Sequence, residues 1–331
     1  MDARADLPTV DDIRAARERL RTHAVVTPLL GSPALDAMLG GRVLFKAECL
    51  QRTGSFKFRG AYNRIAMIPE ADRARGVVAC SSGNHAQGIA EAARLFGIPA
   101  TIVMPTDAPA LKRARTERSG ARVVPYDRVS EDREAIANAI AAETGATFVH
   151  PYDDPGVMAG QGTVGLEIVD QIAALSLAPD VVVVPASGGG LLAGAGLAIK
   201  AAFADCTLIV AEPEGFDDHR RSLIAGERVA NTELGGSISD ALMAAQPGER
   251  TFAINRKQVS GGVTATDAEA LHAVRVAVEE LKLVVEPGGA VGLGALLAGK
   301  IDVAGKTVVI VLSGGNIDPA VLIRALEAPS A

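Results

Sequence analysis

The sequence predicts an α/β protein built from doubly wound open sheets. Short β-branched runs alternate with longer helical patterns along the 331-residue chain, an order that builds right-handed βαβ units. The runs Val181–Val184 and Val308–Val311 are apolar throughout, which is typical of parallel strands buried on both faces. Glycine-bearing loops follow three of the runs, at the place where open α/β sheets bind anionic ligands.

The elements can be predicted in chain order from these patterns. A first helix is expected near Thr9, because Asp12 three residues later provides a weak capping signal. Six strands follow, each a short apolar run: Val77–Ala79, Thr101–Met104, Arg122–Val124, Val181–Val184, Leu208–Ala211 and Thr307–Leu312. No composition change or low-complexity linker marks a boundary, so the residues alone do not divide the chain into domains.

Composition and charge argue against several classes of protein. The length allows one large α/β domain or two smaller ones. A net charge of −6 argues against a nucleic-acid partner, because such proteins usually carry a basic face. Cys49, Cys80 and Cys206 lie too far apart for metal-type pairing, which favours a reduced, cytoplasmic setting. The acidic start is not typical of a signal peptide, and no uncharged apolar stretch reaches membrane-spanning length.

A glycine-rich loop follows the strand Val181–Val184 and precedes a helical pattern. The loop residues are Ser187, Gly188, Gly189, Gly190 and Leu191. Backbone N–H groups of such a loop converge on an anion, and the helix dipole adds attraction. The loop is not a nucleoside-triphosphate P-loop, because no Lys-Ser/Thr pair follows it. It is not a dinucleotide-binding fingerprint either, because Ile199 occupies the position of the final glycine. The loop therefore indicates a phosphate other than a nucleoside triphosphate, with a tight structural turn as the alternative.

Lys57 lies in the run Ser55-Phe56-Lys57-Phe58-Arg59-Gly60, and two further glycine-bearing loops accompany it. They are Ser-Ser-Gly-Asn-His at 81–85 and Ser-Gly-Gly-Asn at 313–316. A lysine flanked by phenylalanines is usually a surface residue whose alkyl chain covers apolar atoms. Three glycine-bearing loops on the same chain favour the opposite interpretation, in which Lys57 lies in a binding site that these loops form.

These four segments, in this order, resemble the motifs of the fold-type II pyridoxal-phosphate (PLP) enzymes. Within that family the chain is most similar to threonine/serine dehydratases and serine racemase, from about Thr27 to Asp318. The resemblance implies a tryptophan synthase β-like fold, with two doubly wound open-sheet domains and the cofactor in the cleft between them. It also implies a large domain of residues 1–50 and 148–331 and a small domain of residues 51–147.

The same resemblance implies cofactor-binding roles. Lys57 would form a Schiff base with the cofactor aldehyde and then remove the substrate's Cα proton, which requires an amine that is partly uncharged. Phe56 would pack against the ring, Asn84 would hydrogen-bond the 3′-oxygen, and Glu286 would lie near the ring. The loop at 187–191 would cradle the phosphate.

Ser313 would face the pyridine nitrogen of the cofactor. An aspartate at this place would keep the nitrogen protonated, whereas a hydroxyl would leave it largely neutral. Less negative charge would then spread into the ring. This arrangement is expected to favour loss of a β-substituent over transamination.

The substrate's α-carboxylate would be held by the loop that contains Ser81, Ser82, Gly83 and His85. In serine racemase the serine that matches Ser82 acts as an acid/base on the ring face opposite the lysine, so Ser82 is either a carboxylate ligand or catalytic. Arg133 aligns roughly with an arginine near the serine racemase pocket, and a solvated helix start is the alternative. An inward guanidinium would bind a second carboxylate and make the substrate 3-hydroxyaspartate.

A divalent-cation site is also implied by the resemblance. The stretch Glu212–Asp218 is similar to the Glu-Pro-x-x-Ala-Asp-Asp stretch of metal-dependent relatives. The ligands would be Glu212, Asp218 and the main-chain carbonyl of Phe216, a residue that is usually alanine. Oxygen ligands suit Mg²⁺, Ca²⁺ or Mn²⁺. A solvated acidic turn is the alternative.

The resemblance implies a PLP-dependent ammonia-lyase. Such an enzyme would convert threonine or serine to a 2-oxo acid and ammonia by α,β-elimination. Two alternatives stay open: a 3-hydroxyaspartate dehydratase that gives oxaloacetate, and a serine or amino-acid racemase. A cytoplasmic homodimer is expected, with an amino-acid substrate and neither nucleic acid nor membrane as a partner.

Overall fold

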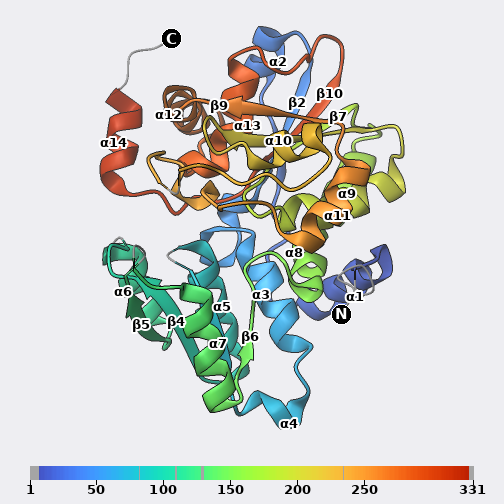
Figure 1. The fold of residues 1–331 in the computed structure, drawn as a ribbon. Coiled ribbons are helices and arrows are strands. Elements are labelled where there is room, and N and C mark those ends of the chain that lie inside the picture. Colours follow the sequence, from blue (N-terminus) through green and yellow to red (C-terminus); the bar gives the residue numbers. More distant parts are fainter. Residues whose placement is uncertain (1–6, 82, 109, 128–129, 234, 328–331) are drawn as a thin grey trace.

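The computed structural model describes residues 7–81, 83–108, 110–127, 130–233 and 235–327. Within these ranges the chain forms two α/β domains, each organised around its own sheet (Figure 1). The described part includes no helix that is both long enough and apolar enough to cross a bilayer. The two sheets with their covering helices confirm the predicted fold class.

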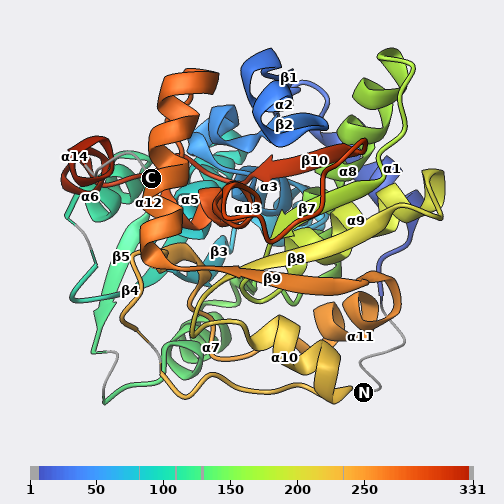
Figure 2. The same ribbon diagram turned by 90° about the horizontal axis from the view of Figure 1, so that it is seen from above.

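The larger sheet has six strands in the order β1-β2-β10-β7-β8-β9 in the described chain. Its strands are β1 (Leu29–Gly31), β2 (Arg42–Ala47), β7 (Val181–Pro185), β8 (Thr207–Pro213), β9 (Gly261–Ala265) and β10 (Thr307–Leu312). β1 is antiparallel to β2, and each later neighbour pairs in parallel. Figure 2 shows β7, β8, β9 and β10 side by side.

The smaller sheet has the order β5-β4-β3-β6 and is parallel in every described pair. Its strands are β3 (Val77–Cys80), β4 (Ala100–Pro105), β5 (Arg122–Tyr126) and β6 (Thr147–Phe148). The chain passes from the large domain into this sheet, and after β6 it returns to the large domain. The expected boundaries at residues 51 and 147 stay a prediction.

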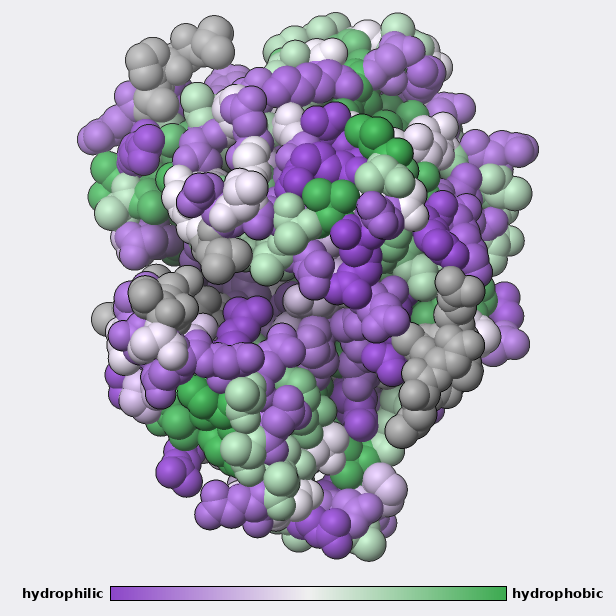
Figure 3. All heavy atoms as spheres, in the orientation of Figure 1, coloured by the Kyte–Doolittle hydropathy of each residue, from purple (hydrophilic) through white to green (hydrophobic). Residues whose placement is uncertain are grey.

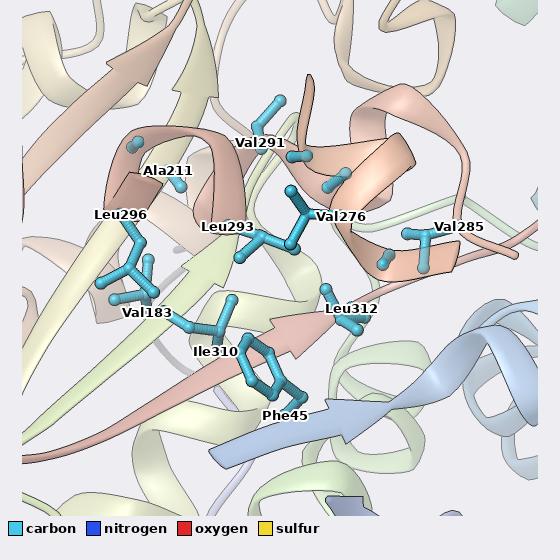
Figure 4. Packing of buried hydrophobic residues seen from close by; sticks show 14 of the residues in the cluster. Phe45, Val183, Ala211, Val276, Val285, Val291, Leu293, Leu296, Ile310 and Leu312 are labelled. Atoms are coloured by element: carbon cyan, nitrogen blue, oxygen red, sulfur yellow. The ribbon is translucent and has the colours of Figure 1, made fainter. Parts of the chain in front are cut away.

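Helices cover both faces of each of the two sheets. The helices are α1 (Val10–Leu20), α2 (Pro33–Leu39), α3 (Lys57–Ala66), α4 (Glu70–Arg73), α5 (Asn84–Phe96), α6 (Ala110–Arg118), α7 (Arg133–Thr144), α8 (Pro155–Ala174), α9 (Gly190–Ala202), α10 (Asp218–Ala225), α11 (Glu249–Gln258), α12 (Asp267–Val276), α13 (Pro287–Leu297) and α14 (Pro319–Glu327). Val182 packs with Ile168 of α8 on one face of the large sheet. Val183 and Ile310 pack with Leu293 of α13 on the other (Figure 4). Consecutive valines therefore enter different cores, as their apolar run predicts.

The six predicted strands are all present, and the described residues form four further strands that the sequence patterns do not predict. β2 carries charged residues at Arg42 and Lys46, β9 begins with Gly261 and Gly262, and β6 has two residues. Glycine and charged side chains are poor strand formers, so tertiary pairing decides these elements.

The first helix begins as predicted. The Thr9 side chain accepts the Asp12 N–H at 3.3 Å, and the Asp12 carboxylate accepts the Thr9 N–H at 2.8 Å. This reciprocal pair is a complete capping box, which satisfies two N–H groups at the start of α1.

Close packing around α8 joins the two domains. A Cβ atom on Gly160 would lie 2.4 Å from the Arg59 carbonyl oxygen in α3, and one on Gly165 would lie 2.4 Å from the Ala195 carbonyl oxygen in α9. Only glycine allows these helix backbones to approach so closely. The packing fixes α3, which carries Lys57, against the large domain.

A buried ion cluster lies at the same junction. The Arg59 guanidinium, 1% exposed, bonds both oxygens of Glu48 at 2.8 Å and those of Glu167 at 2.6 and 2.8 Å. Lys46 donates to Glu167 at 2.6 Å. Burial alone would raise the pKa of Glu48, but the neighbouring Arg59 holds that pKa below its usual value.

Replacing Arg59 is predicted to destabilise the fold strongly. Arg59→Met leaves the Glu48 carboxylate buried without its partner, so the free energy of unfolding in urea should fall by roughly 3–5 kcal/mol at pH 7. Because the folded pKa of Glu48 is lowered, the stabilisation is present at neutral pH and is lost as pH falls through that pKa.

Arg17→Ala is the matched control, because its pair with Asp170 at 2.9 Å is exposed. It should cost at most about 1 kcal/mol. Equal losses in the two variants would contradict the importance of the buried cluster.

Candidate active site

A pocket lies where the carboxyl ends of β3, β7 and β10 meet, between the two domains. The predicted site residues that line it are Phe56, Lys57, Ser81, Gly83, Asn84, His85, Arg133, Ser187, Gly188, Gly189, Gly190, Leu191, Glu286 and Ser313. Ser82 lies outside the described residues. In the space-filling view, polar side chains predominate where the two domains meet (Figure 3). The pocket therefore brings together the motifs that were expected to share one site.

Lys57 begins α3 and directs its amine into the pocket. Its Nζ donates a hydrogen bond to the Pro151 carbonyl oxygen at 2.8 Å and lies 5.2 Å from the centre of the Phe56 ring. Burial lowers the pKa of Lys57 to about 8, because a low-dielectric site disfavours the charged amine. More of the amine is therefore uncharged near neutral pH than in an ordinary lysine, which suits a nucleophile and base.

The runs around Lys57 and Ser313 are directly joined. Ser55 and Gly314 form an antiparallel bridge, and the Phe56 N–H donates to the Ser313 carbonyl oxygen at 3.2 Å. Ser313 is 6% exposed and lines the pocket. Segments from opposite ends of the sequence are thereby fixed around one cavity.

The loop at 187–190 has the form of an anion cradle. A Cβ atom on Gly188 would lie 2.2 Å from the Tyr152 ring, and Gly189 adopts a φ of +93° with His219 2.5 Å from its missing Cβ. α9 begins at Gly190, so its first N–H groups have no partner within the helix. Both glycines are thus required by space or backbone angle, and the free N–H groups fit a phosphate.

Asn84 is held between two side chains. Its amide nitrogen donates to Glu286 Oε1 at 2.5 Å, and its amide oxygen accepts from Asn316 at 2.7 Å. Burial raises the pKa of Glu286 to about 7, and Glu286 Oε2 has no partner among the described residues. This unsatisfied buried oxygen belongs to a residue that lines the pocket, and it fits a polar group of a bound ligand. Asn316 is the last residue of the Ser-Gly-Gly-Asn run at 313–316, and the sequence alone indicates no role for its side chain.

His85 is fixed in one tautomer. Its Nε2 lies 3.1 Å from the Val149 carbonyl oxygen, which can only accept, so the ring proton is on Nε2 and Nδ1 is an acceptor. Burial, and then the nearby Lys57, lower the pKa of His85 to about 3. The neutral ring in this tautomer cannot donate to a carboxylate. Backbone N–H groups at the start of α5 are the better carboxylate donors of this loop.

Arg133 begins α7, and its side chain lines the pocket. Within the described ranges its guanidinium has no hydrogen bond or ion pair to another residue, while the neighbouring Glu134 lies 3.7 Å from His150. Lys112 and Asp240 also line the pocket and form an ion pair between α6 and the short helix η3 (Asp240–Leu242). The sequence gives no signal for this pair, because its partners are 128 residues apart.

The predicted cation ligands Glu212 and Asp218 lie together, with ligand atoms of these residues and His219 within 4.8 Å of one another. Burial, and then the nearby Asp218, raise the pKa of Glu212 well above its usual value, and burial raises that of Asp218 to about 7. Asp218 Oδ2 has no partner among the described residues. A buried carboxylate pair of this kind fits a hard cation. Phe216 lies in the turn between them and is 5% exposed.

Fold and site together define an α/β enzyme that holds a phosphorylated small molecule against a buried lysine. The chain belongs to the pyridoxal-phosphate-dependent enzyme family, whose profile matches residues 20–314. The free N–H groups of the glycine loop, the Lys57 amine and the unsatisfied Glu286 oxygen fit this cofactor.

Known proteins resemble the chain over nearly its whole length. It is 46% identical to an L-threo-3-hydroxyaspartate ammonia-lyase of Pseudomonas sp, covering 94% of this chain and 96% of that protein. It is 39% identical to a serine racemase of Schizosaccharomyces pombe, covering 94% and 95%. A solved threonine deaminase of T.th. superimposes with a TM-score of 0.89 at 42% identity, covering 94% and 99%. Dehydratases and racemases are thus both among its relatives.

Covalent capture of the cofactor aldehyde should depend on pH. Only the uncharged Lys57 amine attacks a carbonyl, so the capture rate should rise with pH and level off above about 8, the lowered pKa of Lys57. The measurement is incorporation of PLP into cofactor-free protein from pH 6 to 9.5, trapped with borohydride.

Lys57→Arg should incorporate nothing, whereas Lys112→Ala, which removes another pocket amine, should keep the profile of the native chain. A rate that does not change with pH, or incorporation into the Lys57→Arg variant, would contradict the assignment.

Proposed function

We propose that the protein is a PLP-dependent ammonia-lyase that eliminates the β-hydroxyl group of a β-hydroxy amino acid, with 3-hydroxyaspartate favoured over threonine and serine. The observation that carries the substrate preference is Arg133, a guanidinium that lines the pocket without a partner in the described chain. A second carboxylate on the substrate would supply that partner through a bidentate hydrogen bond. The similarity to an L-threo-3-hydroxyaspartate ammonia-lyase supports the same preference.

The residues of the pocket divide the chemistry among them. When bound, PLP would supply an aldehyde for attachment of the substrate amine and a ring that accepts negative charge from Cα. Lys57 Nζ takes the Cα proton, for which its lowered pKa prepares it. The N–H groups at the start of α5 hold the α-carboxylate, and Arg133 holds the β-carboxylate. Ser313 would offer a hydroxyl to the pyridine nitrogen, which would keep the ring from retaining the full charge.

The overall reaction is balanced by water. The substrate loses its Cα proton and its β-hydroxyl group as water, and hydrolysis of the resulting imine then consumes one water. The products from 3-hydroxyaspartate are oxaloacetate and ammonia. Threonine would give 2-oxobutanoate and ammonia, and serine would give pyruvate and ammonia. The ion pair between Lys112 and Asp240 joins the two domains at the pocket.

We also propose a divalent cation, Mg²⁺ or a similar ion, at Glu212, Asp218 and the Phe216 carbonyl. The buried carboxylates with raised pKa values support this site, because a cation would offset their repulsion. The domain division at residues 51 and 147 and the homodimer stay proposals that rest on family resemblance, and the cytoplasmic location stays a proposal that rests on the few, widely spaced cysteines.

Arg133 variants test the substrate proposal. Arg133→Ala should lower kcat/KM for 3-hydroxyaspartate roughly 100-fold, the effect of one lost charge-assisted bidentate contact, and should change kcat/KM for serine and threonine less than about threefold. Ammonia release from each substrate is the measurement, with inversion at Cα followed in parallel.

Arg113→Ala removes an exposed charge of the same domain and should leave all three substrates unaffected. Equal losses on all substrates in the Arg133 variant would contradict the dicarboxylate pocket. Inversion faster than ammonia release would contradict the lyase assignment.

Cation binding should stabilise the protein. Mg²⁺ at about 100 times its Kd should raise the Tm of chelator-treated protein by roughly 5 °C, and Glu212→Gln and Asp218→Asn should abolish that rise. Asp217→Asn is the control, because Asp217 pairs with Arg220 and Arg221 rather than with the cluster. A Tm rise that survives in the Glu212 and Asp218 variants would place the ion elsewhere.

A further inference from the structure

Three consecutive carbonyl groups of the loop at 187–190 are held from outside the pocket. The Ser187 oxygen lies 3.1 Å from His219 Nδ1, the Gly188 oxygen accepts from Thr251 Oγ1 at 2.6 Å, and the Gly189 oxygen accepts from Asn255 Nδ2 at 3.2 Å. Thr251 and Asn255 lie one turn apart on α11, so both face the loop. His219 comes from α10.

These contacts decide where the N–H groups of the loop point. In a trans peptide unit the C=O and the following N–H point in opposite directions. A carbonyl held away from the pocket therefore turns the next N–H towards it. The carbonyls of Ser187, Gly188 and Gly189 control the N–H groups of Gly188, Gly189 and Gly190, which line the pocket.

The protonation of His219 follows from the geometry. The Gly189 oxygen can only accept, so the atom of Asn255 that faces it is the amide nitrogen. The same nitrogen lies 3.1 Å from His219 Nε2, which therefore accepts. The ring proton of the neutral imidazole is then on Nδ1, where it donates to Ser187.

His219 is the single donor to the Ser187 carbonyl within the described ranges. By contrast, the Gly188 carbonyl also accepts from the Gly248 N–H at 3.1 Å, and the Gly189 carbonyl from the Ala193 N–H at 2.9 Å. Loss of the His219 contact would free one peptide unit of the cradle, whereas the other two units have a second support.

The backbone of His219 is fixed independently of its ring. Its N–H donates to Glu212 Oε1 at 2.9 Å, and the ring is fully buried. The ring lies 2.5 Å from the position of a Cβ on Gly189, so the imidazole occupies the space that this glycine leaves. Although His219 lies beside Glu212 and Asp218, both ring nitrogens are engaged elsewhere and neither is free to bind a cation.

We propose that His219 is a positioning residue for the cofactor phosphate: its Nδ1–H holds the Ser187 carbonyl outward and so aims the Gly188 N–H at the anion. This inference rests on the proposed placement of the PLP phosphate on the loop. It predicts that His219 strengthens binding of the cofactor through the cofactor's phosphate, and not through its aldehyde or its pyridine ring.

The test compares PLP with pyridoxal, which lacks the phosphate. Both are titrated into the full chain after removal of its cofactor, and the ratio of Kd for pyridoxal to Kd for PLP is measured. His219→Leu removes the donor, and His219→Asn keeps a donor close to the place of Nδ1 because the asparagine amide nitrogen is equally far along the side chain. Asn63→Leu is the matched control, since Asn63 is buried and donates to the Gly156 carbonyl at 2.7 Å, away from the loop.

His219→Leu should lower the ratio roughly tenfold through weaker PLP binding, with pyridoxal binding changed less than about twofold. His219→Asn should restore most of the ratio although it leaves a cavity, and Asn63→Leu should keep the native ratio whatever its Tm. An unchanged ratio in folded His219→Leu, or no recovery in His219→Asn, would overturn the role of His219 alone. A native chain that binds PLP and pyridoxal equally would overturn the phosphate placement itself.

Discussion

The site depends on keeping one amine, Lys57 Nζ, out of bulk water at the meeting point of strands from two sheets. Burial lowers the pKa of Lys57 to about 8, and the Pro151 carbonyl accepts a hydrogen bond from its amine. The amine is consequently reactive and aimed at the glycine loops. The surrounding elements pack closely enough to keep water out: glycines bring α3, α8 and α9 into contact, and the buried ion cluster joins Arg59 of α3 and Lys46 of β2 to Glu167 of α8.

Two kinds of polar group surround this amine: groups that are hydrogen-bonded to the protein, and groups that keep unused hydrogen-bonding capacity. The glycine loop and the asparagine at 84 are each held by several hydrogen bonds from neighbouring elements. Arg133 and Glu286 Oε2, by contrast, keep unused bonding capacity in the described structure. Groups without protein partners in a pocket are the ones that a ligand can satisfy, which is why the dicarboxylate and the cofactor are assigned there.

Local patterns were sufficient to predict much of this arrangement. The β-branched runs predicted six strands, Thr9 with Asp12 predicted the capping box, and the resemblance of four motifs, in order, to those of a known family implied the lining of one pocket. The tautomer of His85 depends on the Val149 carbonyl 64 residues away, and the contact of His219 with Ser187 spans 32 residues. Such properties arise from tertiary contacts, and no local pattern of residues encodes them. Strand β9 likewise forms because β8 pairs with it, despite its two glycines.

The attachment of the cofactor to Lys57 is the central claim and can be measured directly. The purified protein is reduced with borohydride and digested, and the peptides are sequenced by mass spectrometry. The account predicts one phosphopyridoxyl group per chain, on the peptide that carries Ser55 to Arg59, with the label on Lys57. A label on Lys112 or another lysine, or no label after incubation with PLP, would contradict it.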